Sequence, residues 1–443
     1  VVIDSTIAPV SAGQILPTGT CILAQGVLEK LSANEKQIIQ LKAEKILHVG
    51  TVEQDKYPLS RERLPLDSLR EYPHIRPRTT MVSSVTRIRS TLDFATHTFF
   101  QKYGFLHVQV PIITTTDTEG FSEKFHVTTL LGKTSKEKEP VGVSDADVVS
   151  LEAAKAAIKE KSAVVEQLKR SDSNKESLIV AVQDLQKTNE LARQIEAREK
   201  SKPVTAVKPD LLNFNDDFFG RPSYLTVSGR LHLESYACDI GNVYSFGPRF
   251  QADKTVSSKH VAEIWTVEVE MAFSELGVRL CILKAHVPDK AFETQLQWGV
   301  PLTAEHLSYL ADDHYKRPVI IYDYPKAVKP FYVRLNEDGK TVAAFELVVP
   351  KKDYNREPKL YVQIGTVITG SQNEESFNVL NTRITEFDLS IDQYEWYLDL
   401  RRHGTVKHSG FSLRFDLMVL LTTGLIDVRD VIPFPRSHGT ANS

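Results

Sequence analysis

The sequence has few cysteines and no long apolar run. Its three cysteines, Cys21, Cys238 and Cys281, lie far apart and include no CxxC pair. This spacing argues against a disulfide framework and a zinc knot, and it favours a reducing compartment. No apolar run approaches the roughly 18 residues of a membrane span, and the N-terminus lacks a charged-then-apolar signal pattern. The chain begins Val1-Val2 without an initiator methionine, which is consistent with a missing upstream segment.

The sequence also lacks an excess of charge of one sign. Its 54 Lys and Arg residues against 57 Asp and Glu residues give a formal net charge of −3. No overall basic field therefore favours nucleic acid, and any RNA contact is expected to be a local patch. The 443 residues, 41% hydrophobic and 25% charged, are typical of a soluble globular protein with room for about two or three domains.

Composition changes along the chain predict its organisation. Residues 1–52 alternate β-rich runs, Thr20 to Val27 and Gln37 to Val49, with turn residues, as in a small barrel that lacks some strands. Residues 53–78 place prolines among charges and are interpreted as a hinge. Residues 146–200 lack proline and glycine and predict a helical hairpin, whose nearly balanced charges favour a solvated insert over RNA binding.

Apolar spacing predicts a long helix followed by a strand. From Val85 the apolar residues fall three and four apart, at Ile88, Leu92, Ala95 and Phe99, which is the spacing of one helical face. A glycine at 104 is expected to end this helix, and a strand over residues 105–110 is expected to end at the next proline.

A hairpin is predicted in the middle of the chain. Its strands run from Val243 to Phe250 and from Ile264 to Met271, and the loop between them is polar and basic. In the second strand, Glu268 and Glu270 share one face, which we interpret as a polar floor opposite a core face. The hairpin by itself is compatible with a phosphate-bearing ligand or with a purely structural role.

The C-terminal motifs point to a family. The stretches Tyr394 to Gly404, His408 to Phe411 and Arg429 to Arg436 closely resemble the end of asparaginyl-tRNA synthetases, particularly the cytosolic plant type. The resemblance extends over nearly the whole chain. The family's three class II motifs resemble Val85 to Pro111, Gly247 to Phe273 and Phe411 to Gly424.

This resemblance implies an α+β fold, in which a class II catalytic domain with an antiparallel sheet flanked by helices spans residues 79–443. Residues 1–52 then correspond to a partial OB-fold anticodon-binding domain, residues 53–78 to the hinge, and residues 133–210 to a hairpin insert similar to the WHEP type. The family implies a homodimer through motif 1, tRNA as a partner, a cytoplasmic location and no membrane.

The resemblance also implies an activity, the attachment of asparagine to tRNA-Asn through asparaginyl-adenylate, with ATP and Mg²⁺. Catalysis in the family mainly positions the reactants and neutralises phosphate charge. In motif 2 the family has Phe-Arg-Ala-Glu, where this chain has Gln251 for the arginine that grips the α-phosphate and Asp253 for the glutamate that reads adenine. In motif 3 the arginine that clamps the γ-phosphate is replaced by Leu417.

The positions that carry magnesium in the family are also altered. They correspond to Glu346 and Thr366, and an extra segment from Lys352 to Gln363 lies between them. The chain is also shortened after Leu276 relative to the family. Other family positions are retained, and shared ancestry explains them as well as ligand binding does. The retained candidates are Glu119, Gly120, Ser371 and Arg402 for the substrate and His260 for ATP.

Two nearby arginines could compensate for the missing phosphate ligands. Arg249 lies two residues before Gln251, about 7 Å away along the strand, and Arg414 lies three residues before Leu417. A misplacement near 1 Å already costs about 10²-fold in rate, which argues against both. Three interpretations stay open: a weak asparagine-tRNA ligase, a non-catalytic paralogue that binds RNA or protein, and the product of a decayed gene. The substitutions favour the second.

Overall fold

The computed structural model divides the chain into two compact units, residues 1–125 with 224–443, and residues 126–223. The residues that it describes are 1–4, 6–7, 12–30, 39–59, 64–120, 123–130, 161–162, 184, 188, 213–255, 257–276, 292, 294–295, 297–350, 352–354, 360–362 and 365–441.

The N-terminal segment forms one antiparallel hairpin within its described residues. After the short helix α1 (Ala12–Ile15), strands β1 (Cys21–Lys30) and β2 (Ile39–Gly50) pair with Cys21 opposite Gly50. Both predicted strands are therefore confirmed. Several apolar side chains of the hairpin, among them Leu28, are exposed.

A mixed sheet dominates the first unit. Among the described residues it has seven strands, antiparallel except for the β3–β7 pair. In spatial order they are β3 (Leu106–His107), β7 (Val243–Phe250), β8 (Glu263–Ala272), β14 (His408–Arg414), β13 (Gly365–Gln372), β10 (Thr341–Val349) and β9 (Val319–Pro325).

The predicted central hairpin is confirmed as β7 and β8. The strand predicted over residues 105–110 is shorter in the structure. Its pairing with β7 covers Leu106 and His107, and Val108 donates one further hydrogen bond to Tyr244. The chain then leaves the sheet, because Ile113 and Thr114 pair with the separate strand β6.

The predicted long helix is α3 (Thr80–Lys102), capped by the Thr79 hydroxyl, which accepts from the Val82 amide at 3.3 Å. Gly104 follows it with φ +81°, a conformation that glycine adopts without strain. The apolar face named in the sequence is only partly buried. Val85 is buried, but Phe99 is 53% exposed, and Phe100 is buried in its place. An α-helix has 3.6 residues per turn. Apolar residues spaced alternately three and four apart therefore drift around the helix by about 20° in every seven residues, away from the side that faces the core.

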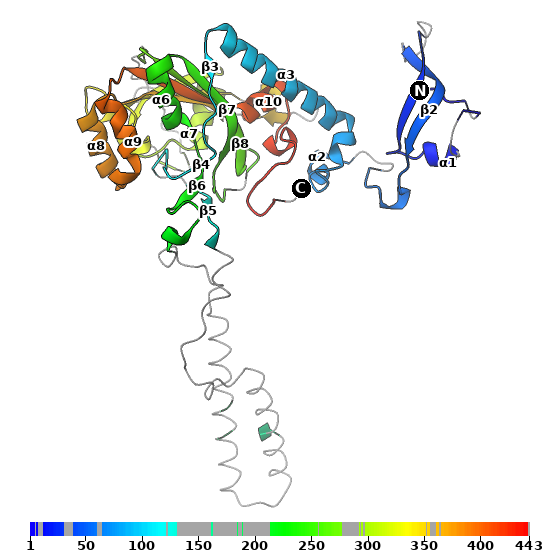
Figure 1. The fold of residues 1–443 in the computed structure, drawn as a ribbon, viewed down its shortest axis with the longest axis horizontal. Helices are drawn as coiled ribbons and strands as arrows, with labels where there is room; N and C mark the ends of the chain where they lie inside the picture. The colour runs from blue at the N-terminus through cyan, green and yellow to red at the C-terminus, as the bar shows by residue number, and fades with distance from the viewer. Residues whose placement is uncertain are drawn as a thin grey trace, which may run out of the picture. The chain divides into compact units, whose positions relative to one another are not determined.

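Helices pack against the two ends of the sheet (Figure 1). Helices α8 (Phe377–Glu386) and α9 (Ile391–Arg402) share a hydrophobic core with β9 and β10. Helices α3 and α10 (Phe415–Thr423) share another core with residues that include Ile264 of β8. Helix α6 (Arg230–Ile240) lies against β7 and β8.

Shorter elements connect these parts. Among the described residues, β11 and β12 form an antiparallel hairpin within the extra segment noted in the sequence. The short elements are η1 (Gln54–Lys56), α2 (Leu66–Leu69), η2 (Arg76–Arg78), β4 (Ile113–Thr114), β5 (His126–Val127), η5 (Phe214–Asp216), β6 (Ser223–Leu225), α7 (Ala304–Ser308), η6 (Tyr309–His314), η7 (Lys326–Val328), β11 (Lys352–Tyr354), β12 (Leu360–Val362) and η8 (Val428–Asp430).

The latter part of the predicted hinge is anchored to the C-terminal segment. The Arg70 guanidinium donates two hydrogen bonds of 2.7 Å to the Asp430 carboxylate. Arg76 is buried and donates to the carbonyl oxygens of Arg429 and Pro433. These charge-assisted bonds fix the entry to α3.

The predicted helical insert lies mostly outside the described residues. Its described part includes helical positions 161, 162, 184 and 188, where the Lys161 ammonium lies 2.9 Å from the Asp184 carboxylate. The segment after Leu276, where the resemblance predicts a shortening, also lies largely outside the described residues. Within the residues described, no helix is long and apolar enough to cross a membrane.

Candidate functional site

The polar face of β8 is buried. Glu268 and Glu270, predicted as a polar floor, are 1% and 0% exposed. They lie on one face of the strand because side chains alternate along it, and α6 packs against β8. Carboxylates buried in this way need cations and hydrogen-bond donors around them.

Glu268 is held by donors from two directions. Ser228 donates to its Oε1 at 2.6 Å, and the Gly229 amide donates to its Oε2 at 2.8 Å. On the other side, the Nε of Arg249 donates to Oε2 at 3.0 Å. Burial acts to raise the pKa of Glu268, but Arg249 and these hydrogen bonds outweigh it and lower the pKa.

Glu270 is held by three residues, from α6, from β14 and from the position just after β13. Arg230 donates to its Oε2 at 3.3 Å, and His408 Nδ1 lies 2.9 Å from its Oε1. Asn373 donates to Oε1 at 3.4 Å. A Cβ atom at Gly410, on the neighbouring strand, would lie 2.1 Å from Oε2, so this position requires glycine.

A third carboxylate, Glu234 of α6, completes the cluster. Tyr397 donates to its Oε2 at 2.5 Å, His408 Nε2 lies 2.9 Å from its Oε1, and the Arg401 guanidinium pairs with the same oxygen. Burial acts to raise the pKa of Glu234, but Arg401 and His408 outweigh it and lower the pKa to about 2. Burial acts to lower the pKa of His408, but the neighbouring Glu234 and Glu270 carboxylates outweigh it and raise the pKa to about 9.

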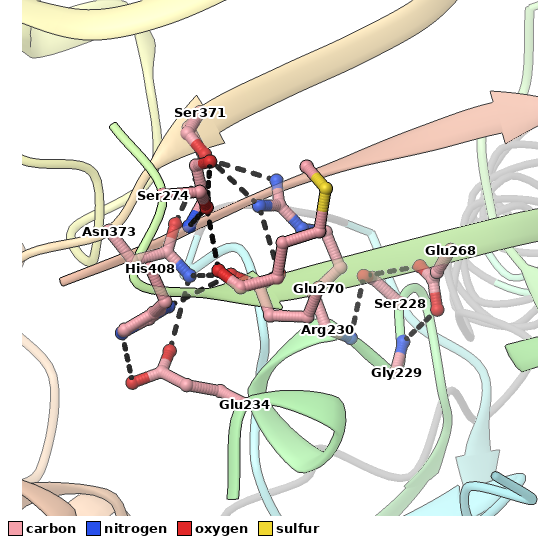
Figure 2. A network of polar contacts seen from close by, with 12 residues as sticks. Ser228, Gly229, Arg230, Glu234, Glu268, Glu270, Ser274, Ser371, Asn373 and His408 are labelled. Atoms are coloured by element: carbon pink, nitrogen blue, oxygen red, sulfur yellow. Dashed lines mark hydrogen bonds and ion pairs between the residues drawn. The ribbon is translucent and has the colours of Figure 1, made fainter. Parts of the chain in front are cut away.

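We call these side chains the buried charge cluster, and Figure 2 shows the part of it around Glu234, Glu268 and Glu270. Each of its carboxylates pairs with at least one cation. The cluster's carboxylates are Glu234, Glu268 and Glu270, and its cations are Arg230, Arg249, Arg401 and protonated His408.

Of the predicted substrate residues, some lie in the buried charge cluster and others lie away from it. Ser371 belongs to the network, because it donates to Asn373 at 3.0 Å and accepts from Arg230 at 3.1 Å. Glu119 and Gly120 lie in a loop whose amides donate to the Asp117 carboxylate at 3.1 and 3.0 Å.

Arg402 lies outside the buried network, and its predicted role at the substrate stays a prediction. It is exposed and pairs with Glu395 and Asp399 on the surface of α9. Its neighbour Arg401 is buried and faces Glu234, with its Nη2 donating to the Glu374 carbonyl at 2.8 Å. The reason is helical geometry, since adjacent residues on a helix point about 100° apart and one of the two must leave the core.

The predicted ATP residues lie in the loop between β7 and β8. Gln251 is exposed. The Asp253 carboxylate accepts from the amide and hydroxyl of Thr255 at 2.8 and 2.6 Å, and these bonds lower its pKa. His260 Nδ1 lies 2.6 Å from the Ser257 hydroxyl. Burial, followed by the positive charge of Arg414, lowers the pKa of His260.

The two arginines considered as replacements are already engaged. Arg249 is 2% exposed, and its guanidinium bonds Glu268 and, at 3.0 Å, the Ser245 hydroxyl. Arg414 donates to the Lys259 carbonyl at 3.0 Å. Leu417 is 1% exposed in the core beside α3. Both guanidinium groups are thus engaged in contacts within the protein.

The predicted magnesium positions meet, but they do not fit a divalent cation. Thr366 donates to Glu346 Oε2 at 3.1 Å, and the Lys329 ammonium pairs with Oε1. Mg²⁺ requires octahedral oxygen ligation, usually with one or two carboxylates. One carboxylate already neutralised by lysine does not supply that. Among the residues described, no group of three or more His, Cys, Asp and Glu residues could hold a metal.

Several members of the buried charge cluster were missed in the sequence. His408 and Arg401 both lie in the C-terminal stretches that resemble the family. The helical spacing of the buried residues around Arg401 could have predicted that it faces the core. Arg230 and Glu234 follow Gly229 at the start of α6 and carried none, because their partners are far away in the sequence. Lys329 was missed for the same reason.

Comparisons with known proteins agree with this architecture. The family model described as tRNA synthetases class II (D, K and N) matches residues 278–438. The chain is 51% identical to asparagine–tRNA ligase, cytoplasmic 2, of Arabidopsis thaliana, an alignment that covers 100% of this chain and 76% of the relative. It is 34% identical to asparagine–tRNA ligase of Protochlamydia amoebophila, covering 96% and 85% of the two chains.

This chain belongs to the asparaginyl-tRNA synthetase family. The fold is similar to that of asparaginyl-tRNA synthetase from Pyrococcus horikoshii complexed with asparaginyl-adenylate, with a TM-score of 0.63 and 22% identity, covering 94% of this chain and 83% of that one. The Entamoeba histolytica asparaginyl-tRNA synthetase gives 0.62 at 14% identity, covering 96% and 84%. The predicted α+β class II fold is therefore confirmed.

Replacing Arg401 with methionine should destabilise this family member strongly. The change leaves Glu234 buried beside fewer cations, which typically costs about 3–5 kcal/mol. The matched change Arg402→Met removes ion pairs at the surface and should leave the urea midpoint unchanged. Urea unfolding followed by circular dichroism measures both. Equal effects of the two changes would contradict the inward placement of Arg401.

The stability of the protein should fall between about pH 6.5 and 9 because of His408. Its folded pKa, about 9, lies above the unfolded value of 6.5, so its contribution is complete below pH 6.5 and is lost as the pH rises through 9. At about 1.4 kcal/mol per pKa unit, the loss is about 3 kcal/mol. His408→Gln should flatten this part of the stability profile, measured by urea unfolding at each pH. A profile that is unchanged in the variant would rule the contribution out.

Proposed function

We propose that this member of the asparaginyl-tRNA synthetase family binds tRNA as a homodimer and does not form asparaginyl-adenylate at an appreciable rate. The proposal rests on the observation that the two arginines nearest in sequence to the substituted positions already bind other groups of the protein. Gln251 stands at the family's α-phosphate position, while the guanidinium groups of Arg249 and Arg414 are engaged by Glu268 and the Lys259 carbonyl.

The free energy of these contacts opposes a rescue by Arg249. Its guanidinium is buried against a carboxylate, and withdrawing it would leave Glu268 without its cation. Breaking such a pair typically costs about 3–5 kcal/mol. A phosphate would have to supply that energy before it gained any new contact.

The motif 3 position supports the same conclusion. Leu417 contributes to the core between α3 and α10, so an aliphatic side chain now serves packing where the family has a phosphate clamp. Its neighbour Asp416 accepts from the Trp265 amide at 2.7 Å and pairs with Arg89 of α3. The strand-to-helix connection is thus retained as a structural element.

The chemistry lost at these positions is large in rate terms. Removing one preorganised charge-stabilising donor costs about 10²- to 10³-fold, and an arginine on a transferring phosphoryl group about 10³- to 10⁵-fold. Binding of ATP and Mg²⁺ is a family property that the altered residues do not favour here. Retention of the family fold supports a role in binding tRNA.

Two further parts of the proposal come from the relatives and from α3. Relatives named as cytoplasmic asparagine–tRNA ligases support a cytoplasmic location. Large apolar side chains are exposed along α3 and just beyond it, which supports a homodimer, because monomers seldom expose a row of such residues. They are Met81, Phe94, Phe99, Tyr103 and Leu106.

Asparagine-dependent exchange between pyrophosphate and ATP tests the loss of adenylation. With the Arabidopsis asparagine–tRNA ligase, cytoplasmic 2, as positive control, this chain should exchange at least about 10³-fold more slowly. An exchange rate within tenfold of the control would overturn the proposal and favour the alternative, a functional ligase. If exchange is measurable, Arg249→Ala and Arg414→Ala then show whether either side chain supports it.

Filter binding of tRNA-Asn, compared with a tRNA of another identity, tests whether the protein binds the tRNA that the family implies.

Light scattering after size exclusion tests the homodimer. The protein should elute with twice the mass of one chain, and Phe94→Glu combined with Phe99→Glu should convert it to a monomer, because charges cannot be buried unpaired in an interface. The control Thr86→Glu places a charge at an exposed position of α3 that points about 80° away from Phe94 and should leave the dimer intact. A monomeric native protein, or a double variant that is still dimeric, would exclude this interface.

A further inference from the structure

A lysine lies where the family carries magnesium. Lys329 follows η7, and its ammonium pairs with Glu346 of β10. Both side chains are largely buried, at 14% and 16% exposure. The ion pair is therefore shielded from solvent and is stronger than a surface pair of the same length.

The remaining contacts hold this pair in place. Thr366 of β13 donates to the second Glu346 oxygen at 3.1 Å, so both carboxylate oxygens are engaged. The Lys329 ammonium lies 3.8 Å from the centre of the Tyr324 ring, a cation–π distance. Burial together with the Glu346 charge raises the pKa of Tyr324, which keeps its hydroxyl neutral beside the pair.

The electrostatics around Glu346 oppose a divalent cation. The charge of this single carboxylate is balanced by Lys329, so an added M²⁺ ion would face an ammonium without a net negative charge to offset it. The site is thus close to neutral before any metal arrives.

We infer that Lys329 is a resident cation that takes the place of the divalent ion at Glu346, so this position binds no magnesium. Any anion held beside β10 and β13 meets a lysine ammonium and requires no metal. The inference concerns cation chemistry at Glu346 and does not depend on whether the chain activates asparagine.

Manganese titration of the full chain, followed by electron paramagnetic resonance without nucleotide, tests the inference. The native protein and its Glu346→Gln variant should give the same signal, because Glu346 holds no ion. The double variant Lys329→Met, Thr366→Glu removes the ammonium and places two carboxylates side by side. It should gain one Mn²⁺ site at least about tenfold tighter than any in the native protein.

Two single variants serve as controls. Lys326→Met removes a nearby lysine, which lies 3.4 Å from Glu386 at the surface, and should create no site. Thr366→Glu alone keeps the ammonium and should also create none. Circular dichroism confirms that each variant is folded.

A Glu346-dependent Mn²⁺ site in the native protein would overturn the inference, and this comparison is decisive even if the double variant does not fold. A folded double variant without a new site would likewise contradict it. Neither outcome bears on pyrophosphate exchange, so a failure here is distinguishable from a failure of the proposed function.

Discussion

The sheet of the first unit depends on cations that neutralise the carboxylates buried beside it. Glu234, Glu268 and Glu270 lie in a low-dielectric interior, where an unpaired ionised carboxylate is strongly unfavourable. The sheet and α6 therefore hold together only if cations reach them from α9, β7 and β14. This requirement explains why residues distant in sequence, such as Arg401 and His408, converge on one cluster.

The same requirement determines which cationic side chains are available to neutralise a bound polyphosphate. Arg249 is two residues from Gln251, yet its guanidinium points to the interior and serves Glu268. A charge turned inward stabilises the fold but cannot neutralise a ligand outside it. Under the proposed function, the substitutions at the family's phosphate positions slow adenylation, while the architecture of the sheet is that of the family.

Glu346 follows this principle at the other end of the sheet. In place of an external ion, Lys329 and Thr366 satisfy its two oxygens. The proposed dimeric, tRNA-binding role requires the scaffold that these pairs stabilise.

The sequence by itself determined the family, the α+β class, the β7–β8 hairpin and α3, because local periodicity and ordered motifs encode them. It also predicted that Gln251 and Leu417 stand at the family's arginine positions, which stays a prediction. Tertiary structure alone decided that Arg401 rather than Arg402 faces inward, that Phe99 is exposed, and that Lys329 neutralises Glu346. Those outcomes depend on side-chain direction and on pairing across long stretches of chain, which spacing along one segment does not specify.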